Sequence, residues 1–201
     1  MGTPSYRWLL LSLALIGFTT DQVSKYGMFR WLYNDGLGDQ REVVEGWFRL
    51  IAQFDPEAKP CDCGFQKAQT WSGEVMPRVN HGALFGMGGS QKGKANGVFL
   101  LISIAASIGI LIWGTRPIVA KDRWLSAALG LILGGTLGNL YDRAVFNGVR
   151  DFLYFYKIDW PVFNIADCCL VVGAGMLLVS AIFAPPETAE EKKPETPTAP
   201  A

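Results

Sequence analysis

The sequence predicts an all-α membrane protein with four transmembrane helices and a small β-rich platform between the first and second helices. Two observations predict this class. Four long stretches of the chain are apolar and almost free of charged side chains, and a long polar segment, residues 26–94, separates the first stretch from the second. In addition, 18% of the 201 residues are charged, whereas an ordinary soluble domain has about 25%.

The first apolar stretch is Trp8–Thr20, directly after Arg7. A basic residue followed by a short apolar run also occurs in secretory signal peptides. The residues TTDQ that close this stretch do not form the small-x-small pattern of a cleavage site, and three further apolar stretches follow. We therefore expect a retained transmembrane helix.

The next three stretches are Val98–Trp113, Trp124–Leu140 and Val162–Ala184. Ala95–Gly97 extend the first of these to nineteen uncharged residues, which at about 1.5 Å per residue cross the roughly 30 Å hydrocarbon core of a bilayer. These stretches are apolar on every side, whereas surface helices of soluble proteins alternate apolar and polar faces. They predict three more transmembrane helices.

The polar segment 26–94 contains a β-like run, Glu42–Phe54, and is interrupted afterwards by Pro56, Pro60 and Pro77. Such runs bounded by breakers are typical of short strands, so we expect a small β-rich platform on one membrane face. Residues 1–184 then form one membrane domain. The remaining residues, 185–201, are rich in Pro, Glu and Thr and predict a disordered tail.

Three basic residues indicate the orientation of the chain. Arg116, Lys121 and Arg123 crowd the short loop between the second and third stretches, and short loops rich in Lys and Arg favour the cytoplasm. With four helices, both termini are then cytoplasmic and the platform is extracytoplasmic.

Composition excludes several functions. A net charge of zero provides no field for nucleic acid. The chain has one histidine, His81, so metal centres and catalytic sites that need several imidazoles are excluded, and no GxSxG motif is present. Residues 88–94, GGSQKGK, nearly match a phosphate-binding loop, but Ala95 lacks the required hydroxyl. We expect no metal and no organic cofactor, and any acid–base chemistry must come mostly from carboxylates.

The four cysteines occur at two places in the sequence, two at each. Cys61 and Cys63 lie in the polar segment, where a disulfide is possible in an oxidising compartment. Cys168 and Cys169 lie in the fourth stretch and are interpreted as packing residues.

Four carboxylates, Asp142, Asp151, Asp159 and Asp167, lie near the last two apolar stretches. Asp167 lies six residues into the fourth stretch, where a charge costs about 2.5–3.5 kcal/mol and normally faces a partner or a water-filled cavity. Two carboxylates that converge on one water share a proton, and such a pair hydrolyses peptides without a metal. The residues alone do not choose which two pair. Caps at helix ends are the alternative interpretation.

Short motifs then resemble those of the bacterial lipoprotein signal peptidases (signal peptidase II), a family of aspartic intramembrane proteases. They occur in the family's order as DQVSK at 21–25, NHGALF at 80–85, GGTLGNLYDR at 134–143, VRDF at 149–152 and FNIAD at 163–167. The match covers most of the chain outside the tail and residues 55–76, which look like an insertion.

The resemblance implies an endopeptidase of the bacterial cytoplasmic (inner) membrane that acts on prolipoproteins. It implies that the substrate is cleaved on the N-terminal side of a diacylglyceryl-modified Cys. It also implies that the enzyme contacts membrane lipids and acts as a monomer. The implied catalytic pair is Asp151 and Asp167. Further residues are implied to organise the site or bind the substrate: Asn139, Asp142, Arg143, Asn164, Asn80, Gly82, Asp21 and Lys25.

Some positions depart from the family's pattern. Leu84 and Gly86 replace the usual Ala and Ser, His81 fills a variable position, and Arg150 stands where an aliphatic residue is common. An Arg150 that faced the site would favour an ionised Asp151; one that faced lipid headgroups would not. Two other functions remain as alternatives: a magnesium-dependent lipid phosphotransferase using the clustered Asp residues, and a small transporter or assembly factor with Asp167 as an ion site.

Overall fold

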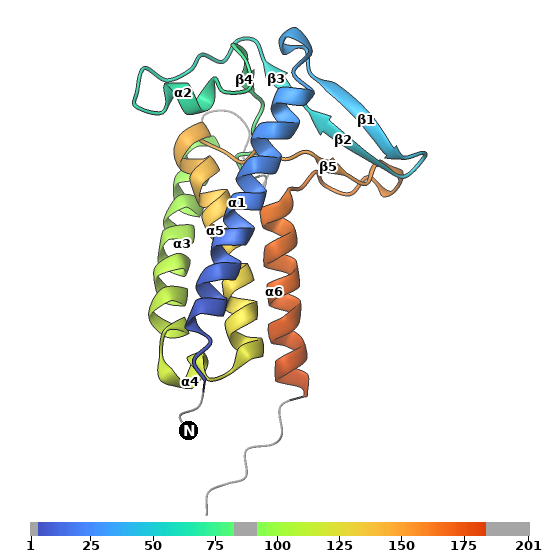
Figure 1. Cartoon of the computed structure of the whole chain (residues 1–201). Helices are drawn as coiled ribbons and strands as arrows, with labels where there is room; N and C mark the ends of the chain where they lie inside the picture. Colours follow the sequence, from blue (N-terminus) through green and yellow to red (C-terminus); the bar gives the residue numbers. More distant parts are fainter. Residues whose placement is uncertain (1–3, 83–91, 184–201) are drawn as a thin grey trace, which may run out of the picture.

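The structure, a computed structural model, describes residues 4–82 and 92–183. Within these residues, long helices pack side by side and the strands gather at one end of the bundle (Figure 1). The long helices are α1 (Arg7–Trp31), α3 (Lys92–Gly114), α5 (Arg123–Phe146) and α6 (Ile165–Ile182), with the short α4 (Pro117–Ala120) between α3 and α5. The tail 185–201, Ala83–Phe85, Gly86 and residues 88–91 lie outside the described residues.

Three helices of the described chain are long and apolar enough to cross a membrane, namely α3 from Lys94, α5 and α6. The helix α1 is as long, but it carries Asp21, Lys25 and Arg30 in its C-terminal half. The N-terminal end of α1 and the C-terminal end of α6 lie at the same end of the bundle, opposite the strands (Figure 1).

Glycines bring α1 and α5 close together. A Cβ atom at Gly134 would lie 2.8 Å from the carbonyl oxygen of Ala14 and 3.2 Å from the Cα atom of Gly17. Only small residues allow two helix backbones to approach this closely. The helix α1 is therefore an integral part of the bundle.

The small sheet is antiparallel. The strands β1 (Asp39–Val44) and β2 (Phe48–Ala52) form a hairpin, so the β-like run predicted at Glu42–Phe54 is a pair of strands with a turn between them. The third strand, β5 (Leu153–Tyr154), pairs with β2 and comes from the connection between α5 and α6. The sheet is thus not built from the segment between the first two helices alone.

The rest of the polar segment forms a second, smaller unit. The strands β3 (Phe54–Asp55) and β4 (Met76–Pro77) pair with each other, and α2 (Gln66–Gln69) lies between them in sequence. Two short 3₁₀ turns, η1 (Asn34–Gly36) and η3 (Tyr156–Ile158), complete the described elements.

Residues 55–76, which the sequence suggested as an insertion, contact the helix bundle. Cys61 and Cys63 form a disulfide. The buried side chain of Gln69 accepts a hydrogen bond from the Cys61 amide at 2.8 Å and donates one to the Val145 carbonyl at 2.6 Å.

The helix ends differ from the predicted boundaries. The helix α1 continues to Trp31, so the polar segment does not begin at residue 26, and α3 already begins at Lys92. The helix α5 continues to Phe146, which places Asp142 inside it rather than at its end. The helix α6 begins at Ile165 because Asn164 caps it, so Asp167 lies in its first turn and not six residues inside.

One apolar cluster joins the platform to the bundle. It contains Phe29 and Leu32 from α1, Ala52 and Phe54 from the strands, and Phe152 from the connection before α6. Phe152 is 2% exposed. Because Phe152 follows Asp151 directly, this cluster holds the backbone that carries Asp151 against the end of α1.

Candidate active site

Asp151 and Asp167 both accept hydrogen bonds from one buried residue, Asn164, through two different amide groups. The Nδ2 atom of Asn164 donates a hydrogen bond of 2.6 Å to Oδ1 of Asp151. The backbone amide of Asn164 donates to Oδ2 of Asp167 at 3.2 Å, and the Asp167 amide donates to Oδ1 of Asn164 at 3.0 Å. This capping box starts α6 and, at the same time, ties the two carboxylates to one residue.

Asn139 and Lys25 orient Asp167 from the other side. Asn139 Nδ2 donates to Oδ1 of Asp167 at 2.9 Å, and its Oδ1 accepts from Lys25 Nζ at 3.2 Å. Since an ammonium group can only donate, Lys25 requires the Asn139 oxygen on its side and thereby directs the Asn139 NH₂ group to Asp167. Asn164 also donates to the Asn139 oxygen, at 3.2 Å.

A buried ionic cluster lies beneath this layer. Lys25 Nζ lies 2.8 Å from Asp21 and 3.4 Å from Asp142, and Arg150 Nη2 lies 2.8 Å from Asp142. All four side chains are 0% exposed. Two cations and two anions neutralise each other, which buried charges require. Gln22 links the two anions by donating to Asp21 at 2.9 Å and to Asp142 at 3.2 Å.

Asp21 also reaches α6. Its Oδ1 accepts a hydrogen bond of 2.9 Å from the backbone amide of Ala166. The first turn of α6 is therefore held by α1 as well as by its own cap, and both contacts set the position of Asp167.

Asn80 approaches Asp151 from the platform. Its backbone pairs with Val149 through two hydrogen bonds of 2.7 and 2.8 Å, and its Nδ2 donates to Oδ2 of Asp151 at 3.0 Å. The Asn80 oxygen accepts from the Gly82 amide at 2.9 Å. Gly82 has φ +87°, a conformation that favours glycine.

A cavity of about 450 Å³ opens beside Asp151. It is lined by β2, by the segment before Gly82 and by the residues before α6, and its lining residues are Ile51, Gln53, Arg78, Val79, Asn80, His81, Gly82, Val149, Asp151, Pro161 and Val162. His81 Nδ1 lies 2.7 Å from the Asn147 carbonyl oxygen, which holds the imidazole at the cavity wall.

The carboxyl group of Asp151 is perturbed. Burial raises the pKa of Asp151 to about 6, and the hydrogen bonds from Asn80 and Asn164 oppose the rise because they favour the charged form. The neighbouring Asp167 charge contributes to the rise. Asp151 can therefore hold a proton up to about pH 6.

Three other predicted candidates make no hydrogen bond or ion pair with the two carboxylates. Asp142 is engaged by Lys25 and Arg150. Asp159 is exposed in a left-handed turn and accepts a hydrogen bond from the Tyr154 hydroxyl at 2.6 Å. The Arg143 guanidinium lies over the Phe99 ring and donates to Asn96.

No group of three or more His, Cys, Asp or Glu residues is arranged to hold a metal in the described part of the chain.

The sequence did not predict the roles of two residues of the site. Gln22 lies inside the DQVSK motif, but only the fold shows that it bridges Asp21 and Asp142. The direction of the Arg150 side chain was open in the sequence; it faces the site at Asp142 and contacts neither Asp151 nor Asp167. It turns inward to Asp142, a contact that no local pattern signals.

Together, the apolar helices and the polar site at their platform end are typical of a polytopic membrane protein. Two solved structures, each described as a bacterial membrane enzyme studied by the in meso method, share this fold with TM-scores of 0.66 and 0.65 at 21% identity. The first match covers 92% of this chain and 99% of that chain; the second covers 98% and 99%.

Sequence comparison specifies the family. The model of signal peptidase II matches residues 65–183. The lipoprotein signal peptidase of Rhodopirellula baltica is 36% identical over 89% of this chain and 74% of its own length, and that of Aeromonas hydrophila is 31% identical over 95% and 94%. The chain belongs to the signal peptidase II family, as the motifs predicted. It is accordingly a membrane protease of the family that removes signal peptides from prolipoproteins.

Proposed function

We propose that the chain is an aspartic endopeptidase that cleaves diacylglyceryl-modified prolipoproteins on the N-terminal side of the modified Cys. Asp151 and Asp167 act together on one water. The observation that carries this proposal is that Asn164 contacts both carboxylates beside an open cavity, Asp151 through its side-chain amide and Asp167 through its backbone amide. Two carboxylates held by one residue can act on the same reacting atoms, as the paired carboxylates of aspartic proteases do.

The two carboxylates have different roles in the reaction. Asp151 holds the proton at rest, since burial raises its pKa to about 6. Asp167, which accepts hydrogen bonds from Asn139 and Asn164, takes a proton from water as the water oxygen attacks the peptide carbon. Asp151 gives its proton to the carbonyl oxygen. Collapse of the diol returns a proton to Asp151 and passes the proton on Asp167 to the leaving amine.

The substrate has an apolar part and a polar part, and the fold offers a different surface to each. The diacylglyceryl chains and the apolar signal peptide lie among lipids beside the helices, and the polar residues after the Cys enter the cavity below β2. This placement requires α1 as a fourth membrane span, both termini in the cytoplasm and the platform outside the bacterial inner membrane. The protein acts as a monomer and needs neither a metal nor an organic cofactor.

Cleavage of a purified diacylglyceryl-modified prolipoprotein in detergent tests this proposal. Asp151→Asn and Asp167→Asn each lower the rate by about 10²–10⁴-fold, because an amide neither accepts nor donates the required proton. Asp159→Asn is the matched control. It makes the same chemical change in an exposed turn whose left-handed backbone Asn tolerates, and it keeps the wild-type rate.

The alternative functions give different results. A magnesium-dependent phosphotransferase loses activity with a chelator, whereas the carboxylate pair does not. A transporter or assembly factor shows no cleavage by folded wild-type protein. Wild-type cleavage that persists in both Asp151→Asn and Asp167→Asn would refute the assignment of the pair.

A further inference from the structure

Arg150 is a buried cation that the proposed reaction does not use. Its side chain is 0% exposed, although arginine is almost never fully buried without a partner. Nη2 donates to Asp142 at 2.8 Å and to Gln22 at 3.0 Å, and Nε donates to the second Asp142 oxygen at 3.2 Å. Arg150 therefore grips the Asp142 carboxylate with two nitrogen atoms, the geometry in which guanidinium binds carboxylate most strongly.

Two aromatic rings enclose the rest of the guanidinium. Its Cζ lies 4.1 Å from the centre of the Tyr26 ring and 4.0 Å from that of Phe146. Nη1 has no hydrogen-bond partner within the described residues, as expected for a group that lies between ring faces. The guanidinium has a single position, set by α1, α5 and the carboxylate.

This anchor acts on the backbone that carries Asp151. The Arg150 amide itself donates to Asp142 at 2.9 Å, so one carboxylate holds both the main chain and the side chain of Arg150. On either side, Val149 pairs with Asn80 and the Phe152 amide donates to the Phe163 carbonyl at 3.0 Å. The three attachments bracket Asp151 and direct its side chain to Asn164.

The same ion pair acts on Asp167 through Lys25. Because Arg150 neutralises Asp142, Lys25 stays nearer to Asp21, at 2.8 Å against 3.4 Å to Asp142, and keeps a donor for the Asn139 oxygen. Without Arg150, Lys25 is the one cation of this cluster that neutralises Asp142. Lys25 then moves toward Asp142 and leaves Asn139, whose NH₂ group is no longer directed to Asp167.

We propose that Arg150 is a positioning residue for both carboxylates: it holds Asp151 through the shared backbone and Asp167 through Asp142, Lys25 and Asn139. This inference rests on the proposed function of Asp151 and Asp167. It predicts a loss in kcat, since misplacing catalytic groups by about 1 Å costs up to about 10²-fold, and little change in KM because Arg150 is outside the cavity.

The test compares kcat and KM for wild type, Arg150→Lys, Arg150→Met and Asp151→Asn, with Arg123→Met as the matched control. Arg123 is exposed at the far end of α5 and keeps wild-type kinetics. Arg150→Met lowers kcat about 10- to 100-fold with KM within about threefold. Arg150→Lys restores part of the loss, because it keeps the charge but not the two-nitrogen grip.

Folding is followed by circular dichroism and thermal unfolding of each variant in the same detergent. If Arg150→Met does not fold, Arg150→Lys decides alone: a kcat at least about threefold below wild type at unchanged KM supports the inference, and a wild-type kcat overturns it. Full activity of folded Arg150→Met, together with an inactive Asp151→Asn, overturns this inference and leaves the proposed function intact. Full activity of both variants overturns the proposed function as well.

Discussion

Asn164 donates a 2.6 Å hydrogen bond to Asp151 while it caps the helix that carries Asp167. One side chain therefore performs two tasks. Its oxygen accepts the Asp167 amide and starts α6, and its nitrogen faces the other carboxylate. Because the tasks use different atoms, substitution can separate them.

Asn164→Ser is expected to separate capping from carboxylate contact. Serine is as good a cap as asparagine, but it has no amide to donate to Asp151 and Asn139. We expect thermal unfolding close to that of wild type and a kcat reduced by about tenfold or more. Asn164→Ala removes both the helix cap and the carboxylate contact, so besides the loss in kcat it lowers the free energy of unfolding by about 1 kcal/mol. Equal kcat in Asn164→Ser and wild type would contradict the role of this contact.

The pH dependence of cleavage follows the protonation of Asp151. Its pKa is raised from 3.8 to about 6, so the protonated form is present below pH 6 and is lost as the pH rises. We expect kcat/KM to fall about tenfold per pH unit above this range.

The pH range in which kcat/KM falls is here called the alkaline limb. Asn80→Ala moves the alkaline limb to higher pH, because the hydrogen bond that is lost favoured the charged Asp151 carboxylate. Gln53→Ala, which changes another residue of the same cavity, leaves the limb in place. A limb that moves to lower pH in Asn80→Ala would contradict this assignment.

Gly134→Ala is expected to loosen the bundle. The added Cβ meets the Ala14 carbonyl and the Gly17 Cα, both of which are backbone atoms that cannot turn away. We expect a loss of about 1–3 kcal/mol in the free energy of unfolding, measured by denaturant titration in detergent. Gly109→Ala is the control, since nothing lies within 4 Å of its Cβ position. An unchanged stability in Gly134→Ala would show that α1 and α5 do not pack this closely.

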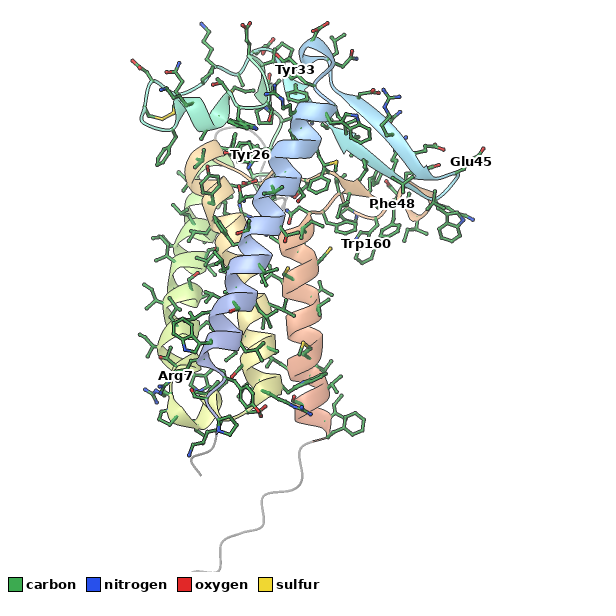
Figure 2. All side chains as sticks on the ribbon, viewed as in Figure 1. Arg7, Tyr26, Tyr33, Glu45, Phe48 and Trp160 are labelled. Carbon is green, nitrogen blue, oxygen red and sulfur yellow. A yellow bond between two sulfur atoms is a disulfide. The ribbon has the colours of Figure 1, made fainter. Side chains whose placement is uncertain are left out.

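The orientation in the membrane can be measured by cysteine labelling. Glu45 lies in the turn between β1 and β2 on the platform (Figure 2). Lys121 is exposed and directly follows α4, which lies at the end of the bundle opposite the strands (Figure 1). A membrane-impermeant maleimide is expected to label Glu45→Cys in intact spheroplasts, and Lys121→Cys only after lysis. Wild type, whose Cys61 and Cys63 are disulfide-bonded, provides the background signal. The reverse pattern would invert the proposed topology.

The positions of the later helices were predictable because lipid imposes one simple demand, apolar residues on every side. The predicted spans within α3, α5 and α6 are confirmed as apolar enough to cross a membrane. Their ends were not predictable. Asn164 starts the fourth helix at Ile165, three residues later than hydropathy suggests, and the polar end of α1 continues to Trp31 because Phe29 packs into the platform.

By itself, the sequence determined the family and the candidate carboxylates, since motifs such as GNLYDR and FNIAD keep their order and spacing along the chain. Only the tertiary structure decided how these motifs meet. It placed Lys25 between Asp21 and Asp142, directed Arg150 inward, and drew a strand from the α5–α6 connection into the sheet. The physical reason is that a buried charge must find a partner, and its partner can come from any part of the chain that the fold brings near.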